Sequence, residues 1–238
     1  MAETTGVRSS GQERIWSHFQ NRASLQFDAS MPRLKWLVRW MKGDWRKPEQ
    51  ATILDIGVGN GVLEAMALEA SFKVAALDPD VEVISRLTKI GVDARVGYAE
   101  SLPFDDSAFD YVVASEVFEH LSDVSREASL VEIFRVLRPG GCLLITVPYD
   151  EDLALGEVVC PDCGKIFHRW GHQKSFTLPS LKEELAQYFP GVIVTRTAFV
   201  DFSGGLTRKI KSLMRLILAH FGQMIAVPSL FAICRKKV

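Results

Sequence analysis

The sequence of 238 residues is poor in cysteine, in net charge and in long apolar runs, and each shortage excludes a class of protein. A net charge of −1 provides no broad basic field for nucleic acid. No basic start is followed by an apolar segment, and no uncharged apolar run reaches the roughly 18 residues of a transmembrane helix, so we expect a cytoplasmic protein. The chain has four cysteines, which are too few for a disulfide framework: Cys142, Cys160, Cys163 and Cys234.

Residues 51–61, Ala-Thr-Ile-Leu-Asp-Ile-Gly-Val-Gly-Asn-Gly, contain the pattern around which the chain is organised. The short apolar run at 53–56 predicts a buried strand, the glycines a tight turn, and the pattern from Val62 onward a helix. Glycine permits positive φ angles and close approach of a ligand, and a helix N-terminus offers free N–H groups to an anion. The stretch therefore predicts the opening unit of an α/β nucleotide-binding fold.

The glycine spacing separates two kinds of ligand. A dinucleotide fingerprint, Gly-x-Gly-x-x-Gly, needs its third glycine at position 62, where this chain has valine. A carboxylate at the end of the strand, Asp55, would repel a pyrophosphate and suit an amino group. The motif alone leaves a dinucleotide enzyme and a purely structural turn open. It resembles the first motif of class I S-adenosylmethionine (SAM)-dependent methyltransferases, which implies that the methionine end of SAM is held by Asp55, Gly57, Gly59 and Gly61.

A second acidic position follows the next predicted strand, residues 73–77, which ends in Asp78-Pro79. An acid about 20 residues beyond such a glycine turn is placed to accept hydrogen bonds from the ribose hydroxyls. The alternative is that Asp78 caps the helix predicted over 80–89, but Asp80 is available for that task. We therefore assign Asp78, with Pro79, to cofactor binding.

The resemblance continues after the third predicted strand. Glu100-Ser-Leu-Pro-Phe is similar to a methyltransferase stretch usually written Asp-Ala-Glu-x-Leu-Pro-Phe, which implies adenine recognition by Tyr98, Ala99 and Glu100. The chain departs from the family at Tyr98, where an acid is common.

The fourth predicted strand, 111–115, runs into Glu116-Val-Phe-Glu-His120-Leu. This also matches the family, in which the corresponding loop touches the methionine end of SAM and faces the substrate. The resemblance adds Ser115 and Glu116 to the cofactor-binding set. It is in family order from about residue 51 to 149 and implies SAM as the cofactor.

An insertion at 151–178 contains Cys-x2-Cys-x4-His-x3-His, four ligands of the types that tetrahedral zinc prefers. We predict a closed, structural zinc site formed by Cys160, Cys163, His168 and His172. A redox cysteine pair and an ordinary loop are the alternatives. In the methyltransferase family a His often precedes the Phe-Thr that opens the next helix, so His172 is open to a second role on the substrate side.

The remaining chain predicts additions around one domain. Residues 1–50 are expected to form a helical cap or lid, and 51–238 the SAM-binding domain. Residues 207–221 are predicted to form a basic amphipathic helix. Its apolar face has three alternative roles: packing on the body, contact with a dimer partner, or peripheral membrane contact.

We predict a three-layer, Rossmann-like α/β fold with helices on both faces of a seven-stranded, mostly parallel sheet whose last strand is antiparallel. The predicted reaction is SN2 methyl transfer from SAM to a small-molecule or glycan- or lipid-type acceptor, with nucleic acid disfavoured. Candidate general bases are His120, His172 and Glu116. An RNA methyltransferase or adaptor that reads through the zinc loop, and a non-catalytic SAM-binding module, are the alternatives. The sequence leaves the acceptor atom and the oligomeric state open.

Overall fold

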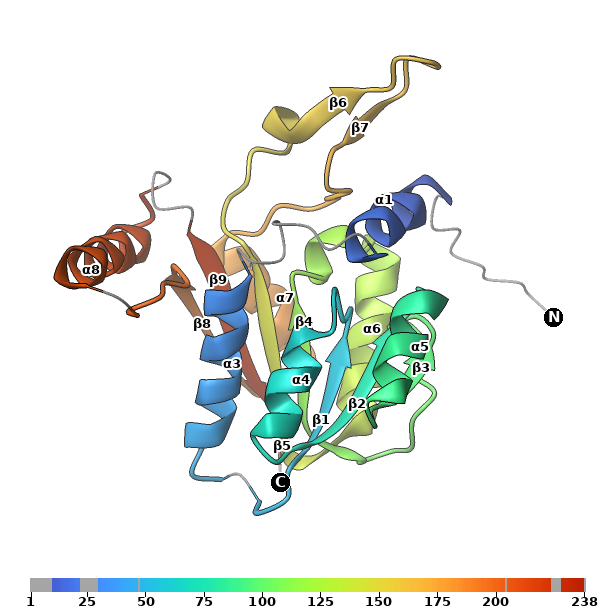
Figure 1. The fold of residues 1–238 in the computed structure, drawn as a ribbon, viewed down its shortest axis with the longest axis vertical. Coiled ribbons are helices and arrows are strands. Elements are labelled where there is room, and N and C mark those ends of the chain that lie inside the picture. Colours follow the sequence, from blue (N-terminus) through green and yellow to red (C-terminus); the bar gives the residue numbers. More distant parts are fainter. Residues whose placement is uncertain (1–9, 22–29, 47, 204, 224–227, 238) are drawn as a thin grey trace.

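A computed structural model of the protein describes residues 10–21, 30–46, 48–203, 205–223 and 228–237. In this part of the chain a seven-stranded sheet runs in the order β3-β2-β1-β4-β5-β9-β8 (Figure 1). Its last strand, β9, is antiparallel to both of its neighbours, which confirms the predicted sheet. The strands are β1 (Thr52–Ile56), β2 (Lys73–Asp78), β3 (Asp93–Val96), β4 (Phe109–Ser115), β5 (Leu137–Pro148), β8 (Gly191–Thr197) and β9 (Ser229–Arg235).

Helices cover both faces of the sheet and form the predicted three layers. One face packs against α3 (Met31–Gly43), α4 (Val62–Glu69) and α5 (Val81–Lys89). The other packs against α6 (Asp123–Val136) and α7 (Leu178–Ala186). The remaining elements are α1 (Ser10–Asn21), α8 (Leu206–His220), the 3-10 helices η1 (Phe118–His120) and η2 (Leu153–Gly156), and a hairpin of β6 (Glu157–Val159) and β7 (Ile166–His168).

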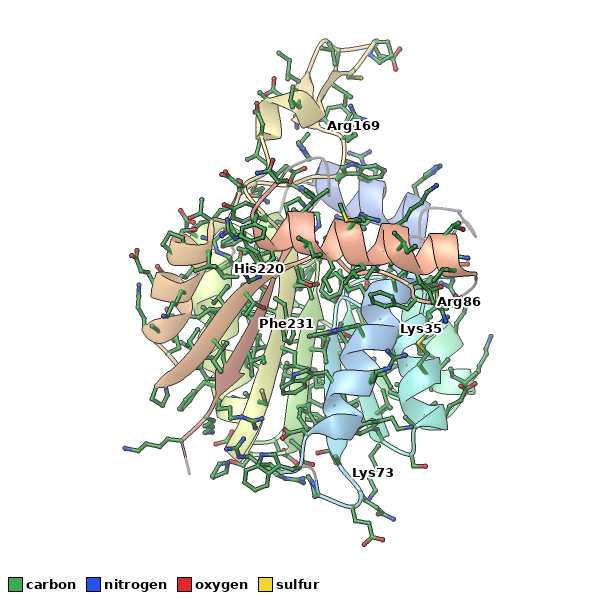
Figure 2. The ribbon with its side chains drawn as sticks, turned by 90° about the vertical axis from the view of Figure 1, so that its left-hand side faces the viewer. Lys35, Lys73, Arg86, Arg169, His220 and Phe231 are labelled. Carbon is green, nitrogen blue, oxygen red and sulfur yellow. The ribbon has the colours of Figure 1, made fainter. Side chains whose placement is uncertain are left out.

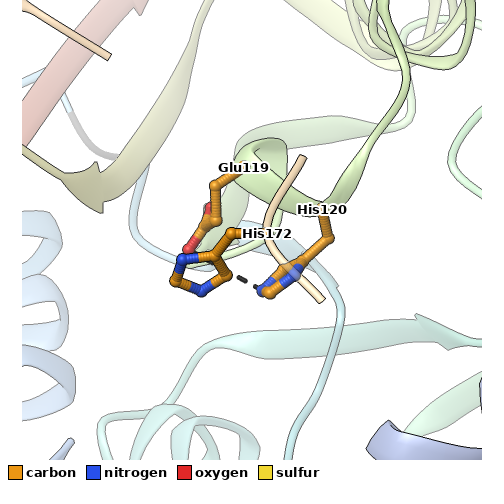
Figure 3. Close-up of side chains that lie close together, drawn as sticks. All are labelled: Glu119, His120 and His172. Carbon is orange, nitrogen blue, oxygen red and sulfur yellow. Dashed lines mark ion pairs between the residues drawn. The ribbon is translucent and has the colours of Figure 1, made fainter. Parts of the chain in front are cut away.

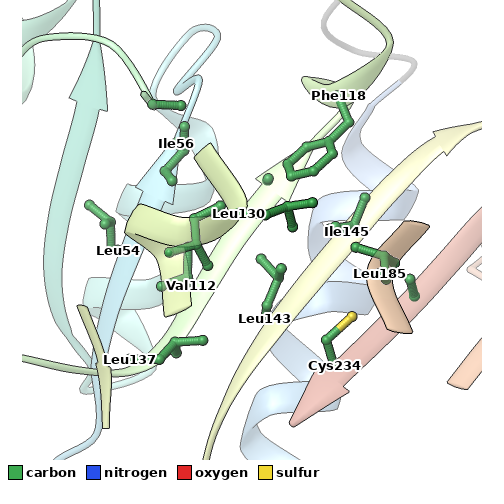
Figure 4. Close-up of a cluster of buried hydrophobic side chains, with 14 of the residues drawn as sticks. Leu54, Ile56, Val112, Phe118, Leu130, Leu137, Leu143, Ile145, Leu185 and Cys234 are labelled. Atoms are coloured by element: carbon green, nitrogen blue, oxygen red, sulfur yellow. The ribbon is translucent and has the colours of Figure 1, made fainter. Parts of the chain in front are cut away.

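Alternating side chains of the central strands supply the two cores. Leu54 of β1 and Leu143 of β5 lie in the cluster under α6 and α7, whereas their neighbours Ile53 and Leu144 face α3 and α4 (Figure 4). Interior strands of a parallel sheet are buried on both faces, which explains their continuous apolar runs. Cys142 and Cys234 are fully buried in these cores.

Helix α3 belongs to the sandwich. Its apolar stripe is buried, and the rings of Trp36 and Trp40 meet Phe231 of β9 edge-on. Each buried leucine contributes about 1.5–3 kcal/mol, which favours α3 as a fixed layer of the domain. Within the predicted cap at 1–50, α1 lies above the strand ends, and residues 1–9, 22–29 and 47 lie outside the described part.

Two elements project from the sandwich at the carboxyl edge of the parallel strands. The β6–β7 hairpin stands above the body, and α8 lies to one side at the same end (Figure 1). The sequence pattern predicted a metal-bound loop here and gave no sign of the two short strands β6 and β7. None of the described helices is both long and apolar enough to cross a bilayer.

Candidate functional site

The loop after β1 has little room for side chains. Gly57, Gly59 and Gly61 all have positive φ angles, of 78°, 55° and 85°. A Cβ atom on Gly57 would lie 2.6 Å from the Cγ2 atom of Val117, which belongs to the loop after β4. The backbone of Gly57 is in turn held by a 2.9 Å hydrogen bond to the carbonyl oxygen of Leu77. Glycine is therefore required here both for backbone conformation and for close packing of two loops.

A pocket of about 1190 Å³ opens above this loop, at the carboxyl ends of β1, β2 and β4 and beneath α1. Ligands of open α/β sheets bind at this edge. Ten predicted site residues line it: Asp55, Gly57, Gly59, Asp78, Pro79, Tyr98, Ser115, Glu116, His120 and His172. Six do not: Gly61, Ala99, Glu100, Cys160, Cys163 and His168.

Asp78 ends β2 inside this pocket and is buried. Its Oδ2 atom accepts hydrogen bonds from the Val58 N–H at 3.1 Å and from Nε2 of Gln20, on α1, at 3.0 Å. Burial raises the pKa of Asp78 to about 6. Asp80 caps α5 by accepting from the N–H groups of Glu82 and Val83, as predicted, which leaves Asp78 available to a ligand.

Asp55 faces a second buried acid, Glu64 of α4. Burial, followed by the charge of Glu64, raises the pKa of Asp55 well above its ordinary value. Burial raises the pKa of Glu64 to about 7. Two ionised carboxylates could only accept hydrogen bonds, whereas a single shared proton lets one donate to the other. The raised pKa values of both groups therefore favour a carboxyl–carboxylate pair over two full charges.

Arg33 brings a positive charge to the end of β4. It reaches from α3, and its Nε atom donates to Oγ of Ser115 at 2.9 Å. Its Nη1 atom lies 3.7 Å from Oε2 of Glu116. Glu116 has a positive φ angle of 58°, uncommon outside glycine, which turns the chain sharply into η1. The strand-end residues that the sequence indicated are thus held by a cation from a distant helix.

The opposite end of the pocket combines two histidines with a buried acid. His120 and His172 have ring centroids 4.7 Å apart, and Glu119 lies beside them (Figure 3). Burial, and then the charge of Glu116, raises the pKa of Glu119 well above its ordinary value. The ring of Trp16, on α1, packs edge-on against His120 with centroids 4.6 Å apart. This end of the pocket is therefore enclosed and lined by proton-carrying and metal-ligating groups.

The four predicted zinc ligands are not brought together. Cys160 and Cys163 lie in the turn at the tip of the hairpin, where the Gly164 N–H donates to the carbonyl oxygen of Cys160. His168 instead pairs across the hairpin with Glu157, at its base, and stacks on His172 with centroids 4.7 Å apart. The β-pairing puts the thiols and the imidazoles at opposite ends of the hairpin. The predicted closed four-ligand site is therefore corrected to two separate groups.

Several pocket residues were missed by the sequence analysis. Glu119 in the pocket wall, and Glu64 buried beside Asp55, left a detectable signal, because each lies three residues after a residue that had been assigned, Glu116 and Gly61. Arg33 and Gln20 left none, since only the fold brings α3 and α1 to the strand ends.

Comparison with known proteins finds similarity to methyltransferases. Residues 54–145 match the family model described as Methyltransferase domain. An uncharacterised methyltransferase of Schizosaccharomyces pombe is 28% identical over 193 residues, covering 76% of this chain and 69% of that protein. Another, of Mycobacterium bovis, is 34% identical over 142 residues, covering 56% of this chain and 57% of that protein. The chain thus spans little more than half the length of the second relative.

A solved structure shares the fold. The 1,6-didemethyltoxoflavin-N1-methyltransferase of Burkholderia thailandensis, with bound S-adenosylhomocysteine, aligns with a TM-score of 0.64 over 95% of this chain and 87% of that one. Identity is 18%, so this likeness concerns the fold alone. Residues 54–145 are thus similar to a methyltransferase domain, the fold is shared with the Burkholderia methyltransferase, and none of these matches identifies the acceptor.

Proposed function

We propose that the protein transfers the methyl group of SAM to an acceptor bound beside Glu119, His120 and His172. The observation that carries the proposal is the convergence of both ends of the reaction on one pocket. Asp55, Asp78 and the glycine loop lie at one end, and the histidines lie at the other. Pockets for single small ligands measure about 300–1000 Å³, so a volume of about 1190 Å³ leaves room for a cofactor and an acceptor together.

The residues fit the cofactor. SAM, when bound, supplies a sulfonium-activated methyl group to the lone pair of an acceptor. Asp78 would accept the ribose hydroxyls, and the carboxyl pair at Asp55 would receive the amino group. The absence of a Cβ on Gly57 lets the loop after β4 pack directly against the glycine loop, and both loops line the pocket. Adenine recognition is assigned to Tyr98, on the pocket wall, with Ala99 and Glu100 beside it.

Catalysis by this chain would be mainly positioning, because the methyl donor is already activated. The acceptor–carbon bond forms as the sulfur–carbon bond breaks, and a proton leaves the acceptor when it carries one. Glu116, His120 and His172 line the pocket and are the candidate groups to take that proton.

Calorimetric titration of the purified chain with SAM, and separately with NAD, tests the cofactor. We expect saturable binding of SAM and none of NAD. Acceptor classes would then be screened with a labelled methyl group, with Asp78→Ala as the inactive control. Binding of NAD without SAM would reject the proposal.

We also propose that α8 rests on an anionic membrane surface, which favours a lipid-linked acceptor. The helix has four lysine and arginine residues and no acidic residue. It attaches to the body through buried Ala219 and through Ser212, whose hydroxyl donates to the Asp201 carbonyl oxygen at 2.7 Å. Its exposed apolar stripe comprises Leu206, Ile210, Leu213, Met214 and Ile217, with Phe221 just beyond the helix.

The positive charge of α8 favours an anionic lipid surface as the partner of this apolar stripe. A second copy packed on it would set two groups of four cations side by side, whereas an anionic surface would neutralise them. Figure 2 shows α8 on the outside of the molecule, at the end where the hairpin projects. Contact there would turn the pocket end of the sheet toward the bilayer.

Co-sedimentation with phosphatidylcholine vesicles, with and without phosphatidylglycerol, tests this contact. We expect binding only to the anionic vesicles, weakened by salt and lost in Ile210→Asp. The control is Leu155→Asp, which makes the same kind of change at another exposed apolar residue. A dimer seen by analytical ultracentrifugation that Ile210→Asp dissociates, without vesicle binding, would assign the stripe to a second copy and reject the lipid.

A further inference from the structure

We propose that Glu119, His120 and His172 form a three-ligand site for a divalent transition-metal ion at the acceptor end of the pocket. The proposal that an ion binds there depends only on these three side chains. What the ion does there rests on the proposed methyl transfer.

The three side chains converge from two distant segments. Glu119 and His120 belong to η1, after β4, and His172 to the loop before α7. One donor atom from each lies within 4.8 Å of the other two (Figure 3). Both imidazoles have 10% of the side chain exposed, and the Glu119 side chain has 1%. A small ion at the centre of this group would be shielded from bulk water.

The buried carboxylate of Glu119 favours a bound cation. Neither of its carboxylate oxygens has a hydrogen-bond partner among the described residues. The Nε2 atom of His120 lies 3.8 Å from its Oε1 atom, which is an ion pair only when the imidazole is protonated. Buried carboxylates are costly unless they are paired or coordinate a metal. An ion between the acid and the two imidazoles would satisfy this carboxylate.

The loop that carries His172 is held in place against η1. The backbone N–H of Gln173 donates to the carbonyl oxygen of Glu119 at 2.7 Å, and its side-chain amide donates to that of His120, also at 2.7 Å. These bonds fix the approach of His172 before any ion binds. Preorganised ligands of this kind are what a metal site requires.

Glu151 orients the imidazole of His172. Its Oε2 atom lies 2.5 Å from Nδ1 of His172. A carboxylate that accepts the Nδ1–H proton leaves the lone pair on Nε2, and metal-binding histidines commonly carry such a partner. Glu151 therefore acts as a positioning residue outside the ligand set.

A competing group consists of Glu151, His168 and His172, whose donor atoms also lie within 4.8 Å of one another. Of these three residues only His172 lines the pocket. A metal in the competing group would be separated from an acceptor, and it would need the Nδ1 atom or the carboxylate that already face each other. We therefore assign the ion to the group that opens into the pocket.

Three protein ligands leave a coordination position for the acceptor. Two imidazoles and a carboxylate suit Zn²⁺ and similar divalent ions, and three-ligand sites with an open position are catalytic rather than structural. An acceptor hydroxyl placed there would lose its proton more easily. With both histidines bound to the ion, Glu116 would take that proton, and the oxygen–methyl bond would form as the sulfur–methyl bond of SAM breaks. The site would thus suit a hydroxyl acceptor.

The test uses the full chain carrying Cys160→Ser and Cys163→Ser, which removes the thiol pair at the hairpin tip. Titration with Co²⁺, followed by absorption, and with Zn²⁺, followed by calorimetry, should show one ion per chain without a thiolate charge-transfer band. Glu151→Gln should weaken binding roughly 10–100-fold, and Glu119→Gln should weaken it more. The matched control, His168→Ala, should retain the ion.

Three results would overturn the assignment: loss of the ion in the serine variant, unchanged affinity in Glu119→Gln, or loss in His168→Ala with retention in Glu119→Gln. Circular dichroism would verify that each variant is folded. Titration of the same samples with SAM separates the two proposals. SAM binding without metal binding rejects only the site, and metal binding without SAM binding rejects only the methyl transfer.

Discussion

At the residue scale, the electrostatics of the cofactor end of the pocket are set by three buried acidic side chains. Asp55 and Glu64 are buried together, and Asp78 lies near them with a raised pKa. Because burial raises the pKa of each of these groups, a bound cation would favour the release of their protons. The amino group expected from SAM would therefore favour the ionised state of the Asp55–Glu64 pair.

Asp78→Ala should weaken SAM binding by about 1–3 kcal/mol, because the ribose hydroxyls would be left without their acceptor. Calorimetric titration measures the change. Asp93→Ala, which removes an exposed carboxylate at the start of β3, is the control and should bind normally. Equal affinity in the two variants would contradict the ribose assignment.

The pH dependence of stability should reveal Glu64. Its pKa of about 7 in the folded chain lies above the ordinary value of 4.5, so its contribution is present below about pH 4.5 and is lost as the pH rises through 7. One such group changes the free energy of unfolding by at most about 1.4 kcal/mol per pH unit. Urea unfolding of the ligand-free chain between these pH values should show a flatter decline in Glu64→Gln. Identical declines would mean that Glu64 does not titrate there.

At the element scale, α1 is attached to the cofactor end of the pocket by polar contacts. Arg86 of α5 donates to the side chain of Asn21 at 2.6 Å and to the carbonyl oxygen of Gln20 at 3.3 Å. The Asn21 amide donates to Asp80 at 3.0 Å. Because Arg86 is not part of the pocket wall, it provides a way to loosen α1 without changing the pocket itself.

If α1 is a lid, Arg86→Ala should release SAM several-fold faster, since the helix would open more often. Stopped-flow displacement of bound SAM measures the rate. Lys89→Ala removes a neighbouring cation from the last turn of the same helix and should change nothing. An unchanged rate in both variants would leave α1 as a fixed wall of the pocket.

At the scale of the whole molecule, one pocket joins α1, α3, the central strand ends and the loop before α7, so a ligand that fills it should stabilise the fold as a whole. SAM at 100 times its dissociation constant should add about 2.7 kcal/mol to the free energy of unfolding. For a domain of this size that corresponds to roughly 5–10 °C in the melting temperature. Thermal unfolding followed by circular dichroism would show it, with NAD as the control. An equal shift with NAD would contradict specificity for SAM.

The sequence by itself determined the features that depend on neighbouring residues. Strand periodicity, the glycine turn, the Asp80 cap and the acids that end strands are properties of a few consecutive positions, so these elements could be predicted locally. The seven-stranded sheet with its antiparallel last strand was predicted from the family resemblance. The apolar stripe of α8 could also be predicted from its helical spacing. The sequence did not predict that this stripe faces away from the body of the protein.

Only the tertiary structure decided how distant segments meet. The separation of the cysteines from the histidines follows from β-pairing in the hairpin, which the spacing of ligands along the chain does not report. The approach of Arg33 to Ser115, and of His172 to Glu119, depends on packing between elements far apart in sequence. Such contacts are set by the burial of whole helices and strands against one another, and no local pattern encodes them.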